Sequence, residues 1–558
     1  IAQDAIKWLR EQKAYAPEKP FFMYWAPGAA HGPHQIFKEW ADKYKGKFDD
    51  GWDKYRERVF KNAKAKGWIP QNAKLTPRPE TMASWESIPE SEKPFQRRLM
   101  EVFAGFAEHA DYNAGLVIDE IEKQGKLDNT LIFYIWGDNG SSSEGLNGTI
   151  SEQLAQNGIP TKISQHLTAL EELGGLDALG GPKTDNMYNA GWAWAGSTPY
   201  QGTKLQGSYF GGIRQPMAVS WPKGIQHDAT PRSQFHHVID IVPTIYDITK
   251  ITAPKVVNGF QQDPIHGTSM AYTFANAKAK GTRTIQFFDI MGSRGVYKDG
   301  WFASAKGLRE PWVGGLPKGI KEWSPLTDPW QLYNIDEDWS QANDLAAKNP
   351  QKLEEMKALF IDESKKYKNL PIGGGMWSTA MFHPEDAPAP TATEWSFDAP
   401  ITLMPESAAP KLGKNSSLVT MEIDAPANAN GVLYALCGFS GGVTCYVKDG
   451  ILSYEFNLFE VQRTKVKASK KLPVGKSKIE VESRLVDKIG GPMDITLRIN
   501  GEVVAKGNVP AAMSLHFGSN ATFDIGTDLD SPVALDYYDL APFSFNGTIG
   551  KTEIKYLK

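Results

Sequence analysis

An Asp-Asn pair directly after an apolar run carries the most informative chemistry in this chain. Leu131 to Trp136, LIFYIW, have the length and the Ile/Phe/Tyr content of a strand buried on both faces. Asp138 and Asn139 follow at its carboxyl end, where open α/β sheets place their ligands. Two adjacent oxygen-bearing side chains suit a hard cation such as calcium. Asp and Asn are also ordinary turn residues, so an Asx turn is the alternative interpretation.

Histidine and lysine residues lie in two further loops that could converge on this pair. His31 and His34 stand in APGAAHGPH, after the apolar segment EKPFFMYWAP, which predicts a second buried strand over Glu18 to Pro27. Lys204 lies in the Gly- and aromatic-rich stretch WAWAGSTPYQGTKLQGSYFGGIRQP. A single His or Lys in a loop is usually a plain polar residue, so only their convergence would indicate a site.

The order of helix and strand patterns predicts the elements that must position these residues. Residues 1–280 alternate the two patterns, which predicts a mostly parallel sheet flanked by helices. Because a helix feeds a strand at the first residue, we expect this α/β core to be N-terminally incomplete. Residues 281–380 predict a small α+β subdomain, and 381–410 a Pro/Ala-rich linker. Residues 411–558 predict an antiparallel β-sandwich with hairpin turns at KDG and NGE.

Composition excludes two classes of protein. The 558 residues contain 61 Lys+Arg against 65 Asp+Glu, and no basic run indicates a nucleic-acid partner. No apolar stretch reaches the roughly 20 residues of a membrane span, so we expect a soluble protein of the bacterial periplasm or cytoplasm. Cys437 and Cys445, in CGFSGGVTC, could form one hairpin disulfide or remain thiols, and they do not fix the compartment.

The motifs together resemble a known family. AAHGPH, then DNG after a strand, then GTKLQGSYFGGIRQP, occur in the order found in the type I sulfatases of the alkaline phosphatase superfamily. The resemblance is greatest to the long bacterial arylsulfatases, and it extends through KFDDGWDKYRERVF and WQLYNIDEDWSQANDLA. It implies an alkaline phosphatase/sulfatase-like α/β core followed by a C-terminal sandwich.

The resemblance also implies roles for four residues. Asp138 and Asn139 match two protein ligands of an active-site calcium ion. His31 matches the histidine that binds the sulfate ester and protonates the leaving oxygen, and Lys204 matches the lysine that binds sulfate oxygens and the departing oxygen. These residue types suit the reaction, because a divalent cation and an ammonium group stabilise the charge that develops as the S–O bond breaks. We expect His34 to be structural.

One part of the family pattern has no counterpart. The family nucleophile is a formylglycine made from the Cys or Ser of a C/S-x-P-x-R motif, and this chain contains no such motif. The early Asp pair of the family metal site is also unmatched. We therefore expect an incomplete calcium site, no nucleophile and no turnover by this chain alone. The missing amino-terminal region would be a partner chain, a processed segment or a truncated part of the gene.

Three functions remain open from the sequence. The leading one is a sulfuric ester hydrolase of the arylsulfatase class. A phosphodiesterase or phosphonate hydrolase of the same superfamily is the enzymatic alternative. A non-catalytic glycan-binding fragment is the third, and it depends on the sandwich fold alone. The natural substrate is not encoded in any recognisable pattern.

Overall fold

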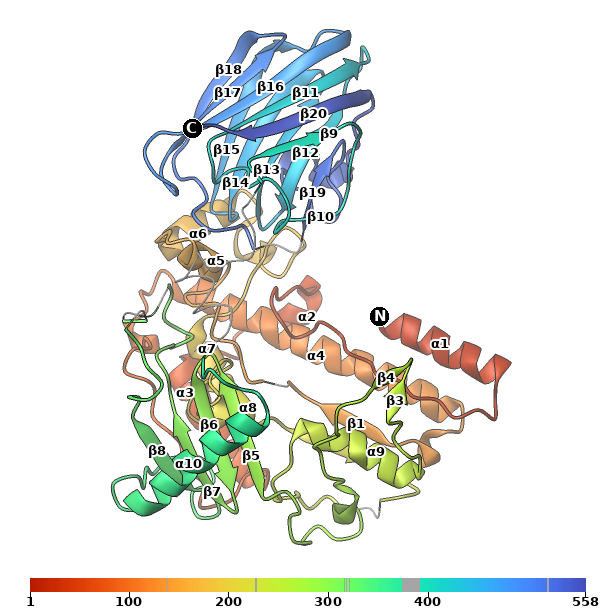
Figure 1. Ribbon diagram of the computed structural model, residues 1–558, viewed down its shortest axis with the longest axis vertical. Helices are drawn as coiled ribbons and strands as arrows, with labels where there is room; N and C mark the ends of the chain where they lie inside the picture. Colours follow the sequence, from red (N-terminus) through yellow and green to blue (C-terminus); the bar gives the residue numbers. More distant parts are fainter. Residues whose placement is uncertain are drawn as a thin grey trace.

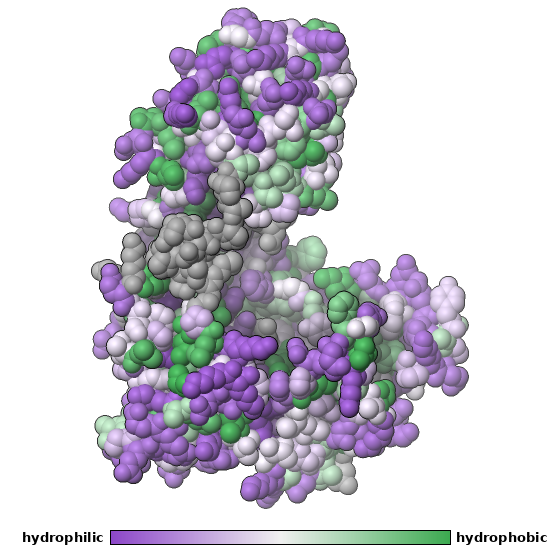
Figure 2. Space-filling model, in the orientation of Figure 1, coloured by the Kyte–Doolittle hydropathy of each residue, from purple (hydrophilic) through white to green (hydrophobic). Residues whose placement is uncertain are grey.

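The protein divides into a helix-rich region, a small mixed subdomain and an all-β domain (Figure 1). The computed structural model describes residues 1–137, 139–225, 228–315, 317, 319–320, 322–373, 392–518 and 521–558. The β domain rises as a separate lobe above the rest, and the N-terminal helix projects to one side (Figures 1 and 2). In the described part of the chain, no helix is long and apolar enough to cross a membrane.

The described helices concentrate in the first half of the chain. They are α1 Ala2–Tyr15, α2 Lys38–Asp42, α3 Gly51–Ala65, α4 Lys93–Lys123, α5 Ser151–Gln156, α6 Ile163–Glu171, α7 Ala190–Gly196, α8 Phe210–Ile213, α9 Ile241–Thr249 and α10 Pro350–Lys366.

The described strands before the β domain are few and short. They are β1 Ile132–Ile135, β2 Met217–Ser220, β3 Val256–Val257, β4 Phe260–Gln261, β5 Ile285–Ile290, β6 Ser293–Lys298, β7 Trp301–Ala305 and β8 Trp330–Asn334.

Helix α4 organises the N-terminal region, because it packs on both sides. Ile6 and Leu9 of α1 are buried against Val117 and Ile121 near its C-terminal end. Its first half joins a separate aromatic core that holds four buried tryptophans, which are Trp52, Trp85, Trp192 and Trp194. The sequence predicted α1 and the long amphipathic helix correctly, since helical periodicity alone fixes which face is buried.

The predicted sheet of this region differs from the structure in its pairing. Strand β1 pairs antiparallel with β2, with Ile132 opposite Ser220, and no other strand joins them in the described residues. β1 is only half-buried along its length, and Ile135 is exposed.

The predicted strand over Glu18 to Pro27 forms no ladder. Its backbone is not assigned to any strand, although burial alternates along it as in a strand. Phe21, Met23 and Trp25 pack against the α1–α4 core, whereas Phe22 and Tyr24 are 70% and 85% exposed. Alternation of apolar residues predicts an extended backbone but does not supply a hydrogen-bonding partner.

The α+β subdomain has the predicted composition. Strands β5, β6, β7 and β8 form an antiparallel sheet in sequential order. Met356 and Phe360 of α10 are buried against Val296, Ala303 and Leu332 of this sheet. Short connections favour this sequential antiparallel order.

The β domain is the predicted sandwich of two six-stranded antiparallel sheets. One sheet has the order β10-β19-β12-β13-β14-β15 and the other β18-β17-β16-β11-β20-β9. Its strands are β9 Glu394–Phe397, β10 Met404–Pro405, β11 Ser417–Ala425, β12 Gly431–Gly438, β13 Gly441–Lys448, β14 Ile451–Leu458, β15 Gln462–Lys471, β16 Gly475–Leu485, β17 Met493–Ile499, β18 Glu502–Val509, β19 Thr522–Ile525 and β20 Thr548–Tyr556.

The domain begins earlier than the sequence predicted. Residues 381–391 of the expected linker lie outside the described residues, but 392–410 contain β9 and β10. β9 pairs with β20, the last strand of the chain, and β10 pairs with β19. The Pro/Ala-rich composition hid these two edge strands, whose partners come from the far end of the sequence.

Cys437 and Cys445 are both buried and form no disulfide. They are not cross-strand partners, since Tyr434 lies opposite Cys445 and Gly442 opposite Cys437. The β12–β13 register therefore settles the alternative that the sequence left open.

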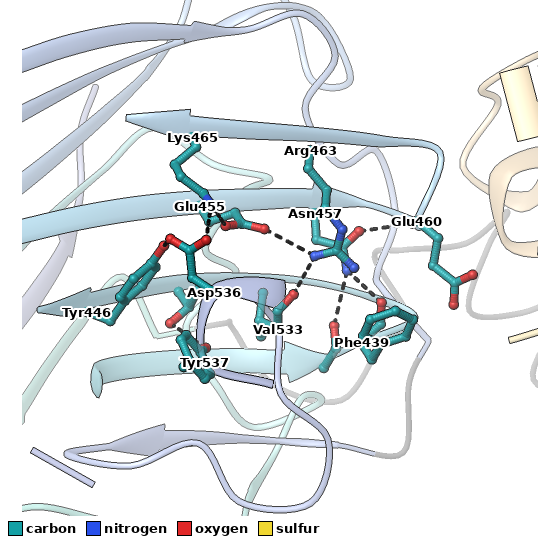
Figure 3. Close-up of polar contacts among 12 residues, drawn as sticks. Phe439, Tyr446, Glu455, Asn457, Glu460, Arg463, Lys465, Val533, Asp536 and Tyr537 are labelled. Atoms are coloured by element: carbon teal, nitrogen blue, oxygen red, sulfur yellow. Dashed lines mark hydrogen bonds and ion pairs between the residues drawn. The ribbon is translucent and has the colours of Figure 1, made fainter. Parts of the chain in front are cut away.

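A buried ionic network fixes the segment Leu535–Leu540 on the sandwich (Figure 3). The Glu455 side chain is 1% exposed and forms ion pairs with Arg463 at 3.1 Å and Lys465 at 3.3 Å. Lys465 also binds Asp536 at 2.7 Å, and the Tyr446 hydroxyl donates to the same carboxylate. The charges in this cluster are paired with one another, which is the arrangement of a structural network.

Candidate active site

His31 and Lys204 lie together, although 173 positions separate them in the chain. The Nζ atom of Lys204 is 3.3 Å from Nε2 of His31. Nδ1 of His31 is 2.8 Å from the carbonyl oxygen of Gly32. A carbonyl only accepts and an ammonium only donates, so Nδ1 carries the proton and Nε2 accepts from Lys204. One ring nitrogen of His31 thus faces the lysine, and the other faces the Gly32 carbonyl.

The loop that holds Lys204 packs directly on the DNG turn. The backbone N–H of Lys204 donates to the carbonyl of Ser141 at 3.0 Å. Gly140 has a left-handed φ of 92°, and a Cβ there would lie 2.2 Å from the carbonyl oxygen of Gly211. Only glycine permits this approach, which explains its place after the Asp-Asn pair.

Of the two predicted metal ligands, the structure describes only Asn139. Asp138 lies outside the described residues. Asn139 is exposed, and it follows the end of β1 in the turn that packs on the Lys204 loop. Among described residues, no group of three or more His, Cys, Asp or Glu side chains is placed to hold a metal ion. The calcium site therefore stays a prediction.

Two carboxylates that the sequence did not single out complete the polar cluster. Oε2 of Glu144 is 3.0 Å from Nζ of Lys204, and Oε1 is 3.4 Å from the guanidinium of Arg309. The pKa of the Glu152 carboxyl is raised to about 7, mainly by burial and further by the charge of Glu144. Glu144 stands in the stretch SSSEG that follows Gly140 in the sequence. This place close to the Asp-Asn pair was the only sequence feature that could have indicated Glu144 as a site residue.

His34 occupies a different environment from His31. Its ring lies among aromatic rings, with centroids 4.9 Å from Phe103 and 4.8 Å from Tyr188. Burial lowers the pKa of His34 to about 3, with a further contribution from the charge of His31. A neutral imidazole packed this way is part of the core and does not reach the His31–Lys204 pair.

A buried arginine binds the backbone segment that leads to the Lys204 loop. The Arg56 guanidinium donates to the carbonyl oxygens of Trp194 at 2.7 Å and Tyr200 at 2.8 Å. It also donates to the Thr76 hydroxyl at 2.8 Å. Arg56 is 1% exposed, so these bonds fix the backbone that leads into residue 204.

The sandwich contacts the helical region without reaching this cluster. The Asp185 N–H donates to Oε1 of Glu460 at 2.9 Å, and the Tyr538 hydroxyl donates to the Pro182 carbonyl at 2.7 Å. Every described member of the polar cluster comes from the regions before the sandwich.

Comparison with known proteins gives a family match in the first half of the chain. Residues 1–251 of the chain match the model of the sulfatase family.

Two curated relatives carry the same description. The chain is 28% identical over 361 residues to an uncharacterized sulfatase of Schizosaccharomyces pombe, covering 63% of this chain and 59% of that protein. It is 25% identical over 271 residues to an arylsulfatase of Klebsiella aerogenes, covering 48% and 54%. The chain thus spans between half and two thirds of the length of these relatives.

Solved structures give weaker likeness. The Ps i-CgsB structure shares 18% identity at a TM-score of 0.36, covering 66% of this chain and 53% of that one. A Bacteroides thetaiotaomicron structure from a study of glycosaminoglycan metabolism shares 15% at 0.38, covering 65% and 54%.

Proposed function

We propose that this chain carries part of the active site of a sulfuric ester hydrolase of the arylsulfatase class. The match to the sulfatase family supports this, and the contact between Lys204 and His31 is the observation that carries it. A cation and an imidazole at hydrogen-bonding distance suit an anionic ester whose leaving oxygen needs both charge stabilisation and a proton.

In the proposed reaction, the chain's own residues bind and protonate. The Lys204 ammonium contacts non-bridging sulfate oxygens and the departing oxygen as negative charge collects there. His31 delivers a proton from Nε2, the nitrogen that faces Lys204, while Gly32 holds the opposite nitrogen through its carbonyl. His31 must first gain that proton, since Nε2 accepts a hydrogen bond in the present state.

Calcium and formylglycine belong to the proposal only as expectations. Calcium takes six to eight oxygen ligands, and of the two ligands predicted here only Asn139 is described. In the complete enzyme Asp138 and Asn139 would supply two of these oxygens, and the ion would stabilise charge on the ester. The nucleophile would come from a segment outside this sequence, either in the same polypeptide or in a partner chain.

The proposal is tested with an enlarged enzyme that includes an upstream C/S-x-P-x-R segment. We expect it to hydrolyse 4-nitrophenyl sulfate faster than bis(4-nitrophenyl) phosphate. Lys204→Ala should reduce the rate roughly 10²–10³-fold, as removal of one charge-stabilising donor does. Lys298→Ala, which removes a surface lysine paired with Glu355, should leave the rate unchanged. Preference for the phosphate diester would instead assign the phosphodiesterase alternative.

His31 is tested in the same enzyme with two leaving groups. His31→Ala should lose roughly 10²–10⁴-fold, because a positioned general acid contributes about that much. The loss should be smaller for an aryl sulfate than for an alkyl sulfate, whose alcohol needs a proton. Equal losses for both esters would remove the proton-donor role.

A further inference from the structure

Glu144 binds cations from two separate parts of the protein. Its Oε2 atom contacts Lys204 at 3.0 Å in the N-terminal region, and its Oε1 atom contacts Arg309 at 3.4 Å in the subdomain. The Ser142 hydroxyl donates to the same carboxylate at 3.2 Å. One carboxylate therefore joins the loop of residue 204 to the segment that follows β7.

The burial of this group distinguishes it from an ordinary surface ion pair. The side chains of Lys204, Glu144 and Arg309 are 17%, 14% and 27% exposed. Fully exposed pairs contribute little, because water and salt screen them and their long side chains lose entropy. Partial burial weakens that screening, so this pair is held more firmly than a fully exposed one.

Both ends of Lys204 are held by the same short stretch of chain. Its backbone N–H binds the Ser141 carbonyl, and its ammonium binds the Glu144 carboxylate. The remaining described contact of Nζ is His31, so the carboxylate aims the ammonium at the imidazole. Glu152, the other carboxyl near this group, has a pKa raised to about 7 by burial and by Glu144, and it is the weaker source of negative charge.

We propose that Glu144 is a positioning residue that holds the Lys204 ammonium directed at His31, and that Arg309 holds the second oxygen of this carboxylate from the subdomain. The catalytic consequence rests on the proposed function. The ion pair itself does not, because it exists in the present chain.

The ion pair is tested by amine labelling of the present chain. The protein is treated with acetic anhydride at pH 8, and acetylation of each lysine is followed by peptide mass spectrometry. In Glu144→Gln the ammonium loses the carboxylate that holds it, so we expect Lys204 to be acetylated roughly three- to tenfold faster.

A matched variant controls for general loosening. Glu310→Gln removes another carboxylate of the subdomain, which pairs with Lys306. It should accelerate labelling of Lys306 and leave Lys204 within twofold of its original rate. Glu144→Asp keeps the charge and should restore Lys204 labelling toward the original rate, which a purely steric role of Glu144 would not produce. Equal Lys204 rates in Glu144→Gln and Glu310→Gln would overturn the proposal.

If Glu144→Gln unfolds, every lysine is labelled faster. The Glu144→Asp variant then tests the positioning role instead. Slow labelling of Lys204 in Glu144→Asp supports the positioning role, and fast labelling of Lys204 alone overturns it.

The enlarged enzyme separates this inference from the function. There, Glu144→Gln should reduce hydrolysis of 4-nitrophenyl sulfate roughly tenfold or more, and Glu144→Asp should recover part of the rate. Altered labelling in an enlarged enzyme without turnover would reject the function and keep the ion pair. Full turnover with unaltered labelling would reject the positioning role and keep the function.

Discussion

Replacing Arg56 by methionine is expected to destabilise the chain by about 3 kcal/mol, because buried acceptors would lose their donor. The guanidinium makes three short hydrogen bonds, at 2.7 Å to Trp194 and 2.8 Å to Thr76 and Tyr200. Hydrogen bonds to a charged donor contribute roughly 1.5–3 kcal/mol each, so their gross value is roughly 4–9 kcal/mol. Removing the buried charge relieves a desolvation penalty of several kcal/mol, which leaves the net loss near 3.

Urea unfolding followed by tryptophan fluorescence measures this loss, since the chain contains 17 Trp. Arg58→Met is the matched control on the same helix, because Arg58 pairs with Asp50 at the surface with side-chain exposures of 44% and 36%. We expect that control to change stability by less than about 0.5 kcal/mol. A loss below about 1 kcal/mol in Arg56→Met, or equal losses in the two variants, would refute the view that Arg56 fixes the approach to residue 204.

Three further predictions follow from single residues. Burial raises the pKa of Asp528 to about 7, so the stability that its protonated form contributes is present below its usual titration range and is lost as pH rises through 7. Asp528→Asn should therefore raise the urea midpoint at pH 8 and not at pH 4. The exposed Asp539→Asn is the control and should change the midpoint at neither pH. In thermal melts, Gly140→Ala should lower the stability by about 2 kcal/mol or more, and it should also increase Lys204 labelling. Gly158 has a left-handed φ of 68° but no atom within 4 Å of an added Cβ, so Gly158→Ala should lower the stability by only about 1 kcal/mol. Cys445 should resist alkylation in the native state and react in urea, because burial raises the pKa of its thiol, and rapid native labelling would show that the sandwich core opens.

Local patterns predicted most of the architecture. Helical periodicity located α1, α4 and α10, and period-two alternation located β11, β16 and β17, because in each case one face is buried along the element. The KDG turn was recognisable since Asp449 and Gly450 both adopt positive φ, at 53° and 78°.

Pairing was less predictable than element type. The apolar segment at Phe21 to Trp25 has no ladder, and β1 pairs antiparallel with β2 rather than within a parallel sheet. Residues 394–397 join a strand more than 150 positions away, at 552–555. Hydrogen-bonding partners depend on distant segments, which a local pattern does not encode.

The candidate site shows the same division. His31 and Lys204 were named from their motifs, and the structure brings them together, while their catalytic roles stay predictions. Glu144 and Arg309 were not named, because their contact spans 165 positions and neither residue stands in a pattern that indicates chemistry. Asp138 lies outside the described residues.

The most direct test of the central claim compares two proteins in one assay. The present chain and the enlarged enzyme with an upstream formylglycine segment are assayed with 4-nitrophenyl sulfate at equal concentration, with and without added calcium. The account predicts no turnover above background by the present chain, and turnover by the enlarged enzyme that falls at least about 10²-fold in Lys204→Ala. Robust turnover by the present chain, with formylglycine excluded by mass spectrometry, would contradict it.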